Sequence, residues 1–250
     1  MPLHPGSPWG RLAADEVQAW VTTLPDASCL PPGWERALCP ADLIRAQRFR
    51  RRSDGVRFLH SRWWLRTLLA SHLGVAPGAL QFATNQYGKP HLTWPAGTGL
   101  HFNLSHSGAL AAIAVSRSCP VGIDVEQVTS EPPIAEGGLS RSELTALRSA
   151  SSPTERAVLF YRIWTWREAV MKAEGTGLGG TPPEWPPGTL WDSQFTRVVI
   201  GANPELTVAN LDLQDGWTGA IAALSSRVRL PTTPQQFVFP IPAVDQVTSR

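Results

Sequence analysis

The sequence predicts an α+β fold built from two similar α/β halves. Stretches with strand periodicity and stretches with helix periodicity both occur, the second half of the chain repeats the order of the first, and two small-residue apolar runs echo each other at residues 108–116 and 219–225. With 250 residues, of which 42% are hydrophobic, the chain can bury a sizeable core. One large domain and two smaller units both fit this composition. Short apolar runs also recur by chance, so these observations alone leave a duplication open.

The first half begins with an alternating, strand-like run at residues 17–24. A helical pattern starts at Asp42, which is placed to cap that helix, and a second helix follows with Asp54 as its expected cap and Gly74 as its stop. Turn residues are concentrated at 85–90 and predict a turn from which Lys89 projects. Strand-like runs surround this turn and follow it, at residues 80–84, 101–104, 109–115 and 122–126.

The second half follows a segment rich in Pro, Glu and Gly at residues 129–138, which we interpret as a hinge between the halves. A short helix is predicted at 142–149 and a long one at 154–174, because the long run starts after a proline and ends at glycines. After Arg227 the chain carries four prolines and is expected to wrap around the surface or to be disordered. Strand-like runs precede this tail at residues 195–200, 206–211 and 217–224.

The composition argues against several classes of protein. A formal net charge of +2 indicates neither a nucleic-acid nor a membrane partner. The three scattered cysteines lack the paired spacing of a zinc site or a disulfide framework, which favours a reducing compartment. No signal peptide and no apolar run long enough to cross a membrane are visible, so we expect a cytoplasmic protein.

Three acids and a lysine are the clearest candidates for functional residues. Glu168 and Lys172 share one face of the long helix, and Asp124 and Glu126 point to the same side of a strand. Their oxygen-only donor set suits Mg²⁺ rather than Zn²⁺. The alternative is a solvated edge strand beside an ordinary helical ion pair, and these residues taken alone favour it. Apolar neighbours, however, suggest a core strand, where two buried like charges need a neutralising cation.

Eight arginines are concentrated in a short part of the first half. A guanidinium binds phosphate oxygens through a planar fork, so this group could hold a compact polyphosphate ligand. Nucleic-acid binding is the rival use, which the near-neutral total charge disfavours. A solvated helix face accounts for most of the group, and we expect only one or two members to touch a ligand. The eight are Arg45, Arg48, Arg50, Arg51, Arg52, Arg57, Arg62 and Arg66.

Ser105 and His106 invite comparison with hydrolases. Neighbouring residues on a strand point to opposite faces, so this pair could not easily act as nucleophile and base. The surrounding sequence also lacks the Gly-x-Ser-x-Gly pattern of a nucleophile elbow. A phosphate contact and a satisfied turn are the two remaining interpretations, and the residues favour them equally.

Five short motifs occur in a fixed order along the chain. They are Asp-Gly-Val-Arg at 54–57, Tyr-Gly-Lys-Pro at 87–90, Phe-Asn-Leu-Ser-His-Ser-Gly at 102–108, Val-Gly-Ile-Asp-Val-Glu at 121–126 and Trp-Thr-Trp-Arg-Glu-Ala-Val-Met-Lys at 164–172. The last three resemble the signature blocks of the Sfp-type 4′-phosphopantetheinyl transferases, and the first two are similar to that family as well. Each motif is weak by itself, whereas all five in the family's order make the resemblance specific.

The resemblance implies two similar α+β halves related by a pseudo-twofold axis, with the active site in the cleft between them. We expect an N-terminal half at 1–122, a C-terminal half with the metal and catalytic residues at 123–228, and a tail at 229–250. The family moves the 4′-phosphopantetheine arm of coenzyme A onto a serine of an apo acyl or peptidyl carrier protein. It releases adenosine 3′,5′-bisphosphate and requires Mg²⁺. A monomer that binds neither nucleic acid nor a membrane is expected.

Carried onto this sequence, the resemblance assigns Asp124, Glu126 and Glu168 to the metal. Glu168 also matches the family's proposed general base, although a metal-held water could relay the proton instead. Lys172 would offset charge growing on the leaving phosphate, with Arg167 assisting as a third catalytic residue. The implied coenzyme A contacts are Arg52, Arg57, Lys89, Ser105, His106 and Lys172.

One position departs from the family pattern, since Arg167 stands where the family usually has lysine. A guanidinium keeps the charge but donates a proton poorly, so only an electrostatic role is expected of it. Glu143 falls where the family often has an additional acid. Two other functions stay open, a Mg²⁺-dependent hydrolase of coenzyme A or a nucleotide, and a non-catalytic module that binds coenzyme A or a carrier protein. The intact set of acids favours an enzyme.

Overall fold

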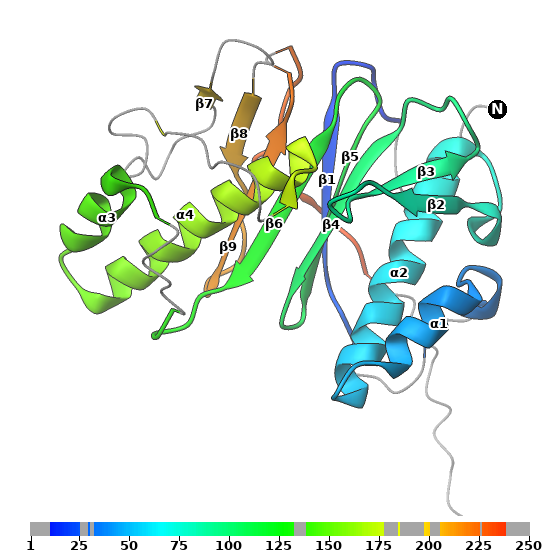
Figure 1. Cartoon of the computed structure of the whole chain (residues 1–250), viewed down its shortest axis with the longest axis horizontal. Coiled ribbons are helices and arrows are strands. Elements are labelled where there is room, and N and C mark those ends of the chain that lie inside the picture. The colour runs from blue at the N-terminus through cyan, green and yellow to red at the C-terminus, as the bar shows by residue number, and fades with distance from the viewer. Residues whose placement is uncertain are drawn as a thin grey trace, which may run out of the picture.

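Among the residues that the structure describes, two sheets form the middle of the molecule and four α-helices lie outside them (Figure 1). The computed structural model describes residues 11–25, 30, 33–132, 139–177, 185, 198–200, 206–225 and 227–238. The predicted α+β class is confirmed. Within these described ranges, no helix is long and apolar enough to cross a membrane.

The first half forms one of the two sheets, a separate hairpin and two helices. Strand β5 lies between β1 and β4 and is antiparallel to both. Helix α1 is short, and α2 is long and is followed by the β2–β3 hairpin. The elements are β1 (Val17–Thr23), α1 (Pro40–Gln47), α2 (Arg52–Leu73), β2 (Gln81–Thr84), β3 (Pro90–Trp94), β4 (His101–Ser107) and β5 (Leu110–Ser116).

The second half repeats this order of elements. A first strand is followed by an 8-residue helix and a 22-residue helix, as in the first half. The two echoing apolar runs form β5 and β9, and each of these strands pairs with the first strand of its own half. The pseudo-twofold axis stays a prediction. The elements are β6 (Val121–Gln127), α3 (Arg141–Arg148), α4 (Pro153–Glu174), β7 (Val198–Ile200), β8 (Leu206–Asn210) and β9 (Trp217–Ala223).

The helices begin where the chain offers a cap, but not always at the predicted residue. Ser152 caps α4, since its hydroxyl accepts a hydrogen bond from the amide of Glu155 at 3.1 Å. Cys39 occupies the cap position of α1, whereas the expected cap Asp42 lies in the first turn and accepts a hydrogen bond from the Cys39 amide. Asp54 likewise lies inside the first turn of α2. Both assignments as caps were wrong by three residues, because Pro40 and Arg52 already adopt helical geometry.

Apolar contacts arrange the molecule as helix, sheet, sheet and helix. Helix α2 packs on one face of the first sheet, and α4 packs on one face of the second. The remaining two faces meet in a core of small and β-branched residues. That central core includes Val21, Ala112, Ala114, Ile123, Val125 and Ile221, all 0–1% exposed.

The two halves join between β5 and β6, at residues 117–120. Strand β6 pairs with β9 along its whole length and therefore belongs to the second sheet. The interpretation of 129–138 as the hinge was wrong, because that segment starts after β6 and leads to α3 inside the second half. Residues 133–138 of it lie outside the described ranges.

The C-terminal tail returns to the first half of the molecule. As far as residue 238 it therefore wraps around the surface, which is the first of the two alternatives expected for it. The amide of Val17 donates to the carbonyl of Arg229 at 3.2 Å, and β10 (Gln235–Gln236) adds a parallel strand beside β1. Phe237 then stacks on Trp64 of α2, with ring centroids 5.6 Å apart. The tail therefore ties the end of the second half to the first sheet.

Candidate active site

The site lies where the edge strands β4 and β6 of the two sheets run side by side, a contact that we call the seam. Alternate residues of β4 face β6 across it. Asn103 accepts a hydrogen bond from the backbone of β6 at 3.0 Å, Ser105 donates to Asp124 at 2.8 Å, and Ser107 donates to Glu126 at 2.6 Å. Side chains thus join the two edges where no backbone ladder does so, and they fix both acids of β6.

Asp124 is the most buried acid of the group, with 2% of its surface exposed. Its Oδ1 atom lies 2.5 Å from Nζ of Lys172, and the same ammonium donates to Oγ of Ser105 at 3.2 Å. Burial raises the pKa of Asp124, while the charge of Lys172 opposes that rise. The other oxygen, Oδ2, is buried and has no hydrogen-bond partner among the described residues.

Glu168 and Glu126 complete a ring of negative charge around the lysine. Glu168 lies one helical turn before Lys172, with its Oε2 atom 4.0 Å from Nζ, and its side chain is 16% exposed. Burial raises the pKa of both glutamates, and the charge of Asp124 raises each further. Three acids therefore share the field of one ammonium, as the helix and strand periodicities predicted.

A glycine allows α4 to approach β6 closely enough to form this group. A Cβ atom at Gly122 would collide with the backbone of α4 at Ala169 and Ala173. Asp124 is two residues further along the same face of β6, so it comes within reach of Lys172. The glycine of the Val-Gly-Ile-Asp-Val-Glu motif thus has a steric role.

The donor set fits Mg²⁺, although the acids do not form a finished metal cage. Within the described part of the chain, no cluster of three or more His, Cys, Asp or Glu side chains is arranged to hold an ion. The available donors are carboxylate oxygens, which a hard ion prefers, and Oδ2 of Asp124 is buried without a partner. Burial is the main cause of the raised pKa values of all three acids, and the negative charge of Asp124 adds to it at Glu126 and Glu168.

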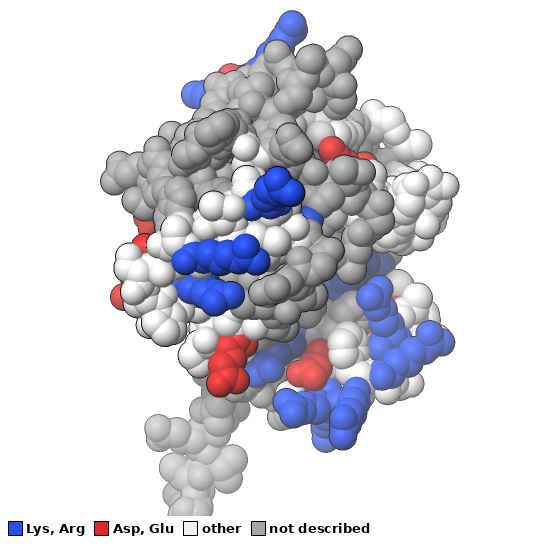
Figure 2. Space-filling view, turned by 60° about the vertical axis from the view of Figure 1, so that its left-hand side comes forward, with Lys and Arg blue, Asp and Glu red and all other residues white. Residues whose placement is uncertain are grey.

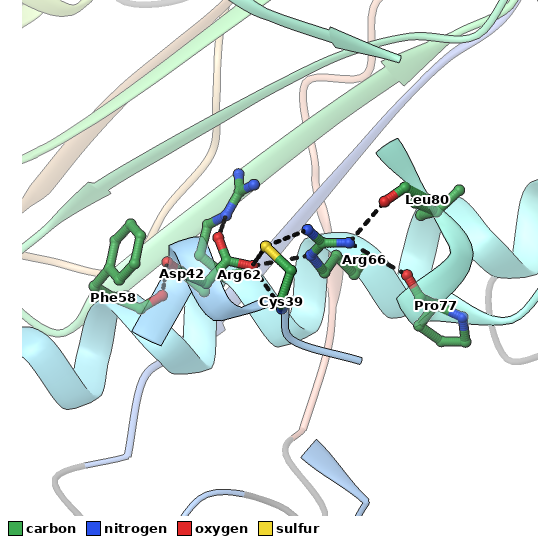
Figure 3. A network of polar contacts seen from close by, with 8 residues as sticks. Cys39, Asp42, Phe58, Arg62, Arg66, Pro77 and Leu80 are labelled. Atoms are coloured by element: carbon green, nitrogen blue, oxygen red, sulfur yellow. Dashed lines mark hydrogen bonds and ion pairs between the residues drawn. The ribbon is translucent and has the colours of Figure 1, made fainter. Parts of the chain in front are cut away.

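Two of the eight arginines are structural (Figure 3). Arg62 and Arg66 both donate to the buried carboxylate of Asp42, at 3.0 and 3.1 Å. Arg66 also donates to the backbone carbonyl of Leu80 at 3.0 Å. These two guanidinium groups hold α1 against α2, so we assign them a structural role and no ligand contact.

The exposed arginines gather around α1 and the start of α2. Basic side chains lie low in Figure 2, at the height where Figure 1 places these elements. Arg57 is half-buried, with Nη1 3.7 Å from Asp54. Arg45, Arg48 and Phe49 line a pocket of about 630 Å³. The exposed members are Arg45, Arg48, Arg50, Arg51 and Arg52.

His106 lies within electrostatic reach of this basic region and of Lys172 at the seam. It is exposed on the face of β4 opposite the buried Ser105, as strand alternation predicted. Surrounding protein atoms lower the pKa of His106 although its ring is exposed, and the positive charge of Lys172 lowers it further. The charges of Asp54 and Arg45 act on the same ring. The histidine therefore lies within electrostatic reach of both groups.

Two of the predicted site residues make their contacts elsewhere. The ammonium of Lys89 donates to the backbone carbonyls of Val121 and Ala173, at 3.2 and 2.8 Å. The guanidinium of Arg167 is buried and donates at 2.5 Å to Glu143, which is itself fully buried. The structure thus places Arg167 and Glu143 in a pair with each other instead of beside Asp124.

Comparison with known proteins identifies the family. A model described as the 4′-phosphopantetheinyl transferase superfamily matches residues 120–222, and one described as 4′-phosphopantetheinyl transferase, N-terminal, matches residues 34–118. The 4′-phosphopantetheinyl transferase HetI of Nostoc sp. is 36% identical over 178 residues, 70% of this chain and 75% of that protein. The 4′-phosphopantetheinyl transferase Sfp of Bacillus subtilis is 31% identical over 187 residues, 74% of this chain and 82% of that protein. The chain belongs to the 4′-phosphopantetheinyl transferase family.

This 4′-phosphopantetheinyl transferase is therefore an enzyme, as the resemblance implied. The two family models meet at the β5–β6 junction, one in each half of the molecule. The superfamily match contains Asp124, Glu126, Glu168 and Lys172, and the N-terminal match contains the arginines and His106. The candidate site residues thus come from both matched regions.

Several residues that build the site of this transferase were not singled out from the sequence. Asn103 and Ser107 alternate with Ser105, and this period of two in a polar run was a usable signal for a face that meets another polar surface. Asn85 donates to the carbonyl of Gly175 at 2.8 Å, and Trp185 donates to Glu143 at 2.7 Å. These last two contacts join distant segments and left no local signal.

Proposed function

We propose that this enzyme transfers the 4′-phosphopantetheine arm of coenzyme A to a serine of an apo acyl or peptidyl carrier protein. The observation that carries the proposal is the buried Asp124–Lys172 pair at the seam, flanked by Glu126 and Glu168. The names of the relatives, 4′-phosphopantetheinyl transferases, support it.

In the proposed reaction, the carrier serine Oγ attacks the β-phosphorus of coenzyme A. A new P–O bond forms, and the bond from this phosphorus to the bridging oxygen breaks, so adenosine 3′,5′-bisphosphate leaves with the electron pair. Glu168 receives the serine proton, directly or through a water, and its raised pKa suits a base that works near neutral pH. Lys172 offsets the charge that grows on the leaving phosphate. Positioning and charge compensation are the main contributions in such transfers.

Asp124, Glu126 and Glu168 are the residues that would hold Mg²⁺. Bound there, the ion would neutralise the pyrophosphate oxygens of coenzyme A. The unpartnered Oδ2 atom of Asp124 supports this assignment, as do the two partly exposed glutamates beside it.

Arg52, Arg57 and His106 would contact the phosphates of coenzyme A. The two arginines lie at the start of α2, His106 is within electrostatic reach of Arg45 and Lys172, and Ser105 accepts a hydrogen bond from Lys172 at 3.2 Å. Arg167 is dropped from the reaction, since its guanidinium is buried against Glu143.

The test is incubation of the full chain with coenzyme A, Mg²⁺ and an apo carrier protein, followed by intact-mass measurement of the carrier. We expect a covalent mass increase that requires the carrier serine and Mg²⁺. Asp124→Asn should abolish it, whereas Asp212→Asn, which removes an exposed acid outside the site, should not. Release of free phosphopantetheine without carrier labelling would identify a hydrolase and overturn the proposal, as would an absence of any turnover.

A further inference from the structure

The turn between β2 and β3 reaches from the first half to the last turn of α4 in the second. Asn85 stabilises the turn itself, since its Oδ1 atom accepts hydrogen bonds from the amides of Tyr87 and Lys89, both at 2.9 Å. The other end of the same side chain, Nδ2, donates to the carbonyl of Gly175 at 2.8 Å. One amide group therefore shapes the turn and attaches it to the end of the helix.

Lys89, the last residue of this turn, makes a second attachment. Its ammonium donates to the carbonyl of Ala173 at 2.8 Å and to the carbonyl of Val121 at 3.2 Å. Ala173 follows Lys172 on α4, and Val121 begins the strand that carries Asp124. One cation thus bridges the two elements whose side chains form the central ion pair of the site.

The acceptors in these contacts suit the donors. The last carbonyls of a helix have no partner within the helix and carry partial negative charge, so an ammonium and an amide stabilise them. Gly175, which ends α4 with φ of 75°, packs closely under the turn. A Cβ atom there would lie 3.0 Å from Nδ2 of Asn85 and 3.1 Å from Cδ of Lys89.

We propose that Asn85 and Lys89 are positioning residues, which hold the end of α4 against the start of β6 and so set the placement of Lys172 relative to Asp124. The resemblance assigns Lys89 to coenzyme A, but its ammonium already contacts two backbone carbonyls of the second half. This inference rests on the proposed transfer, whose rate is one of its readouts.

The kinetic test compares Asn85→Asp with wild type. Aspartate keeps the oxygen that accepts from the turn amides but removes the donor to Gly175, so the attachment is lost while the turn is kept. We expect kcat to fall about 10- to 100-fold with little change in KM for coenzyme A, because misplacement by about 1 Å has effects of this size. Lys89→Met should show the same pattern and Lys89→Arg a partial recovery. Gln86→Ala, an exposed change in the same turn, should behave as wild type.

A second readout does not depend on activity. Amide hydrogen exchange at the end of α4, in peptides covering residues 171–177, should be faster in Asn85→Asp and Lys89→Met than in Gln86→Ala or wild type. A raised KM for coenzyme A with unchanged kcat in Lys89→Met would overturn the inference, since it would make Lys89 a ligand contact. Unchanged kcat and unchanged exchange in both variants would also overturn it. Failure of wild type to label a carrier would instead refute the proposed function and leave the exchange test valid.

Discussion

Among single residues, Lys172 has the largest influence on the charge of the site. Its ammonium lies 2.5 Å from Asp124 and 4.0 Å from Glu168, and it is 27% exposed. A partly exposed cation can turn toward a phosphate, whereas the buried side chain of Asp124 cannot leave its place. The acid therefore anchors the site, and the lysine is the group that can follow a substrate.

Replacing Asp124 by asparagine should separate function from stability. We expect carrier labelling to fall by at least about 100-fold, the size of effect seen when one electrostatic contact to a transition state is lost. The free energy of unfolding should change by no more than about 1 kcal/mol, because the remaining partner Lys172 is 27% exposed and can be solvated, and because burial disfavours the charge that is removed. Labelling rates and urea unfolding measure the two quantities. Wild-type labelling by this variant would contradict the assigned role.

Lys89 should make the stability of the protein depend on pH. Burial lowers its pKa from 10.5 to about 8, so between these values the unfolded chain binds a proton that the folded protein has released. The burial cost of the charged Lys89 ammonium is therefore fully present below pH 8, where it opposes the contacts with Val121 and Ala173, and it disappears as the pH rises toward 10.5. Relative to Lys89→Met, the wild-type free energy of unfolding should rise by up to about 1.4 kcal/mol per pH unit in this window. Urea unfolding at several pH values tests this, and parallel curves for the two proteins would refute it.

Among the elements, α4 is held on both sides of Glu168 and Lys172. Before them, Trp166 donates to Asn210 of β8 at 2.6 Å, and Arg167 donates to the buried Glu143 of α3. After them, the β2–β3 turn holds the last carbonyls of the helix. The segment that carries the site residues is thus fixed at both ends by buried or partly buried polar contacts.

Arg167→Met should destabilise the second half strongly. Glu143 is fully buried and would lose its cationic partner, and breaking a buried ion pair in this way typically costs about 3–5 kcal/mol. The double variant Arg167→Met with Glu143→Gln should recover part of this loss, since it removes the buried charge and the amide oxygen can still accept from Trp185, while the acceptor for the Ser140 amide is lost. Thermal and urea unfolding give the values. A single variant as stable as wild type would contradict the structural role of the pair.

For the whole molecule, the tail has a role beyond covering surface. It leaves the second half after β9, pairs with β1 as a parallel strand and places Phe237 on Trp64 of α2. The carbonyl of Phe237 also accepts a hydrogen bond from Thr22 at 2.7 Å. The second half therefore contributes to the stability of the first.

Phe237→Ala should lower the free energy of unfolding by about 1–3 kcal/mol, the value of burying most of an aromatic side chain. The ring packs on Trp64 of α2, whereas the site residues lie on β4, β6 and α4. Carrier labelling at 25 °C should therefore stay within about twofold of wild type. Val238→Ala, which removes an 81% exposed side chain next to it, is the matched control. Equal stability of the two variants would show that the tail only rests on the surface.

The sequence predicted α4 to within a residue or two. Its apolar pattern runs without interruption between a proline and a glycine, and both signals act locally. The opposite faces of Ser105 and His106, and the shared side of Asp124 and Glu126, followed from strand alternation in the same way. Local periodicity was thus enough to orient most of the side chains that meet at the seam.

The sequence could not indicate where Lys89 and Arg167 make their contacts. The resemblance assigned Lys89 to coenzyme A and Arg167 to the reaction, but Lys89 contacts a carbonyl 84 positions away and Arg167 an acid 24 positions away. The hinge was misplaced for a related reason. Pro and Gly mark any loop, whereas the true junction is defined by which sheet β6 joins, a pairing with a strand almost 100 residues later.

The seam also has a consequence for aggregation. Strands β4 and β6 are both sheet edges, and edges with free backbone groups are templates for pairing with other chains. In the native molecule each edge is covered by the other through Asn103, Ser105 and Ser107. If the halves part, two seven-residue edges become available at once, and either can pair with its counterpart in a second molecule. The same serines that orient the acids of the site thus protect this protein against edge-to-edge aggregation.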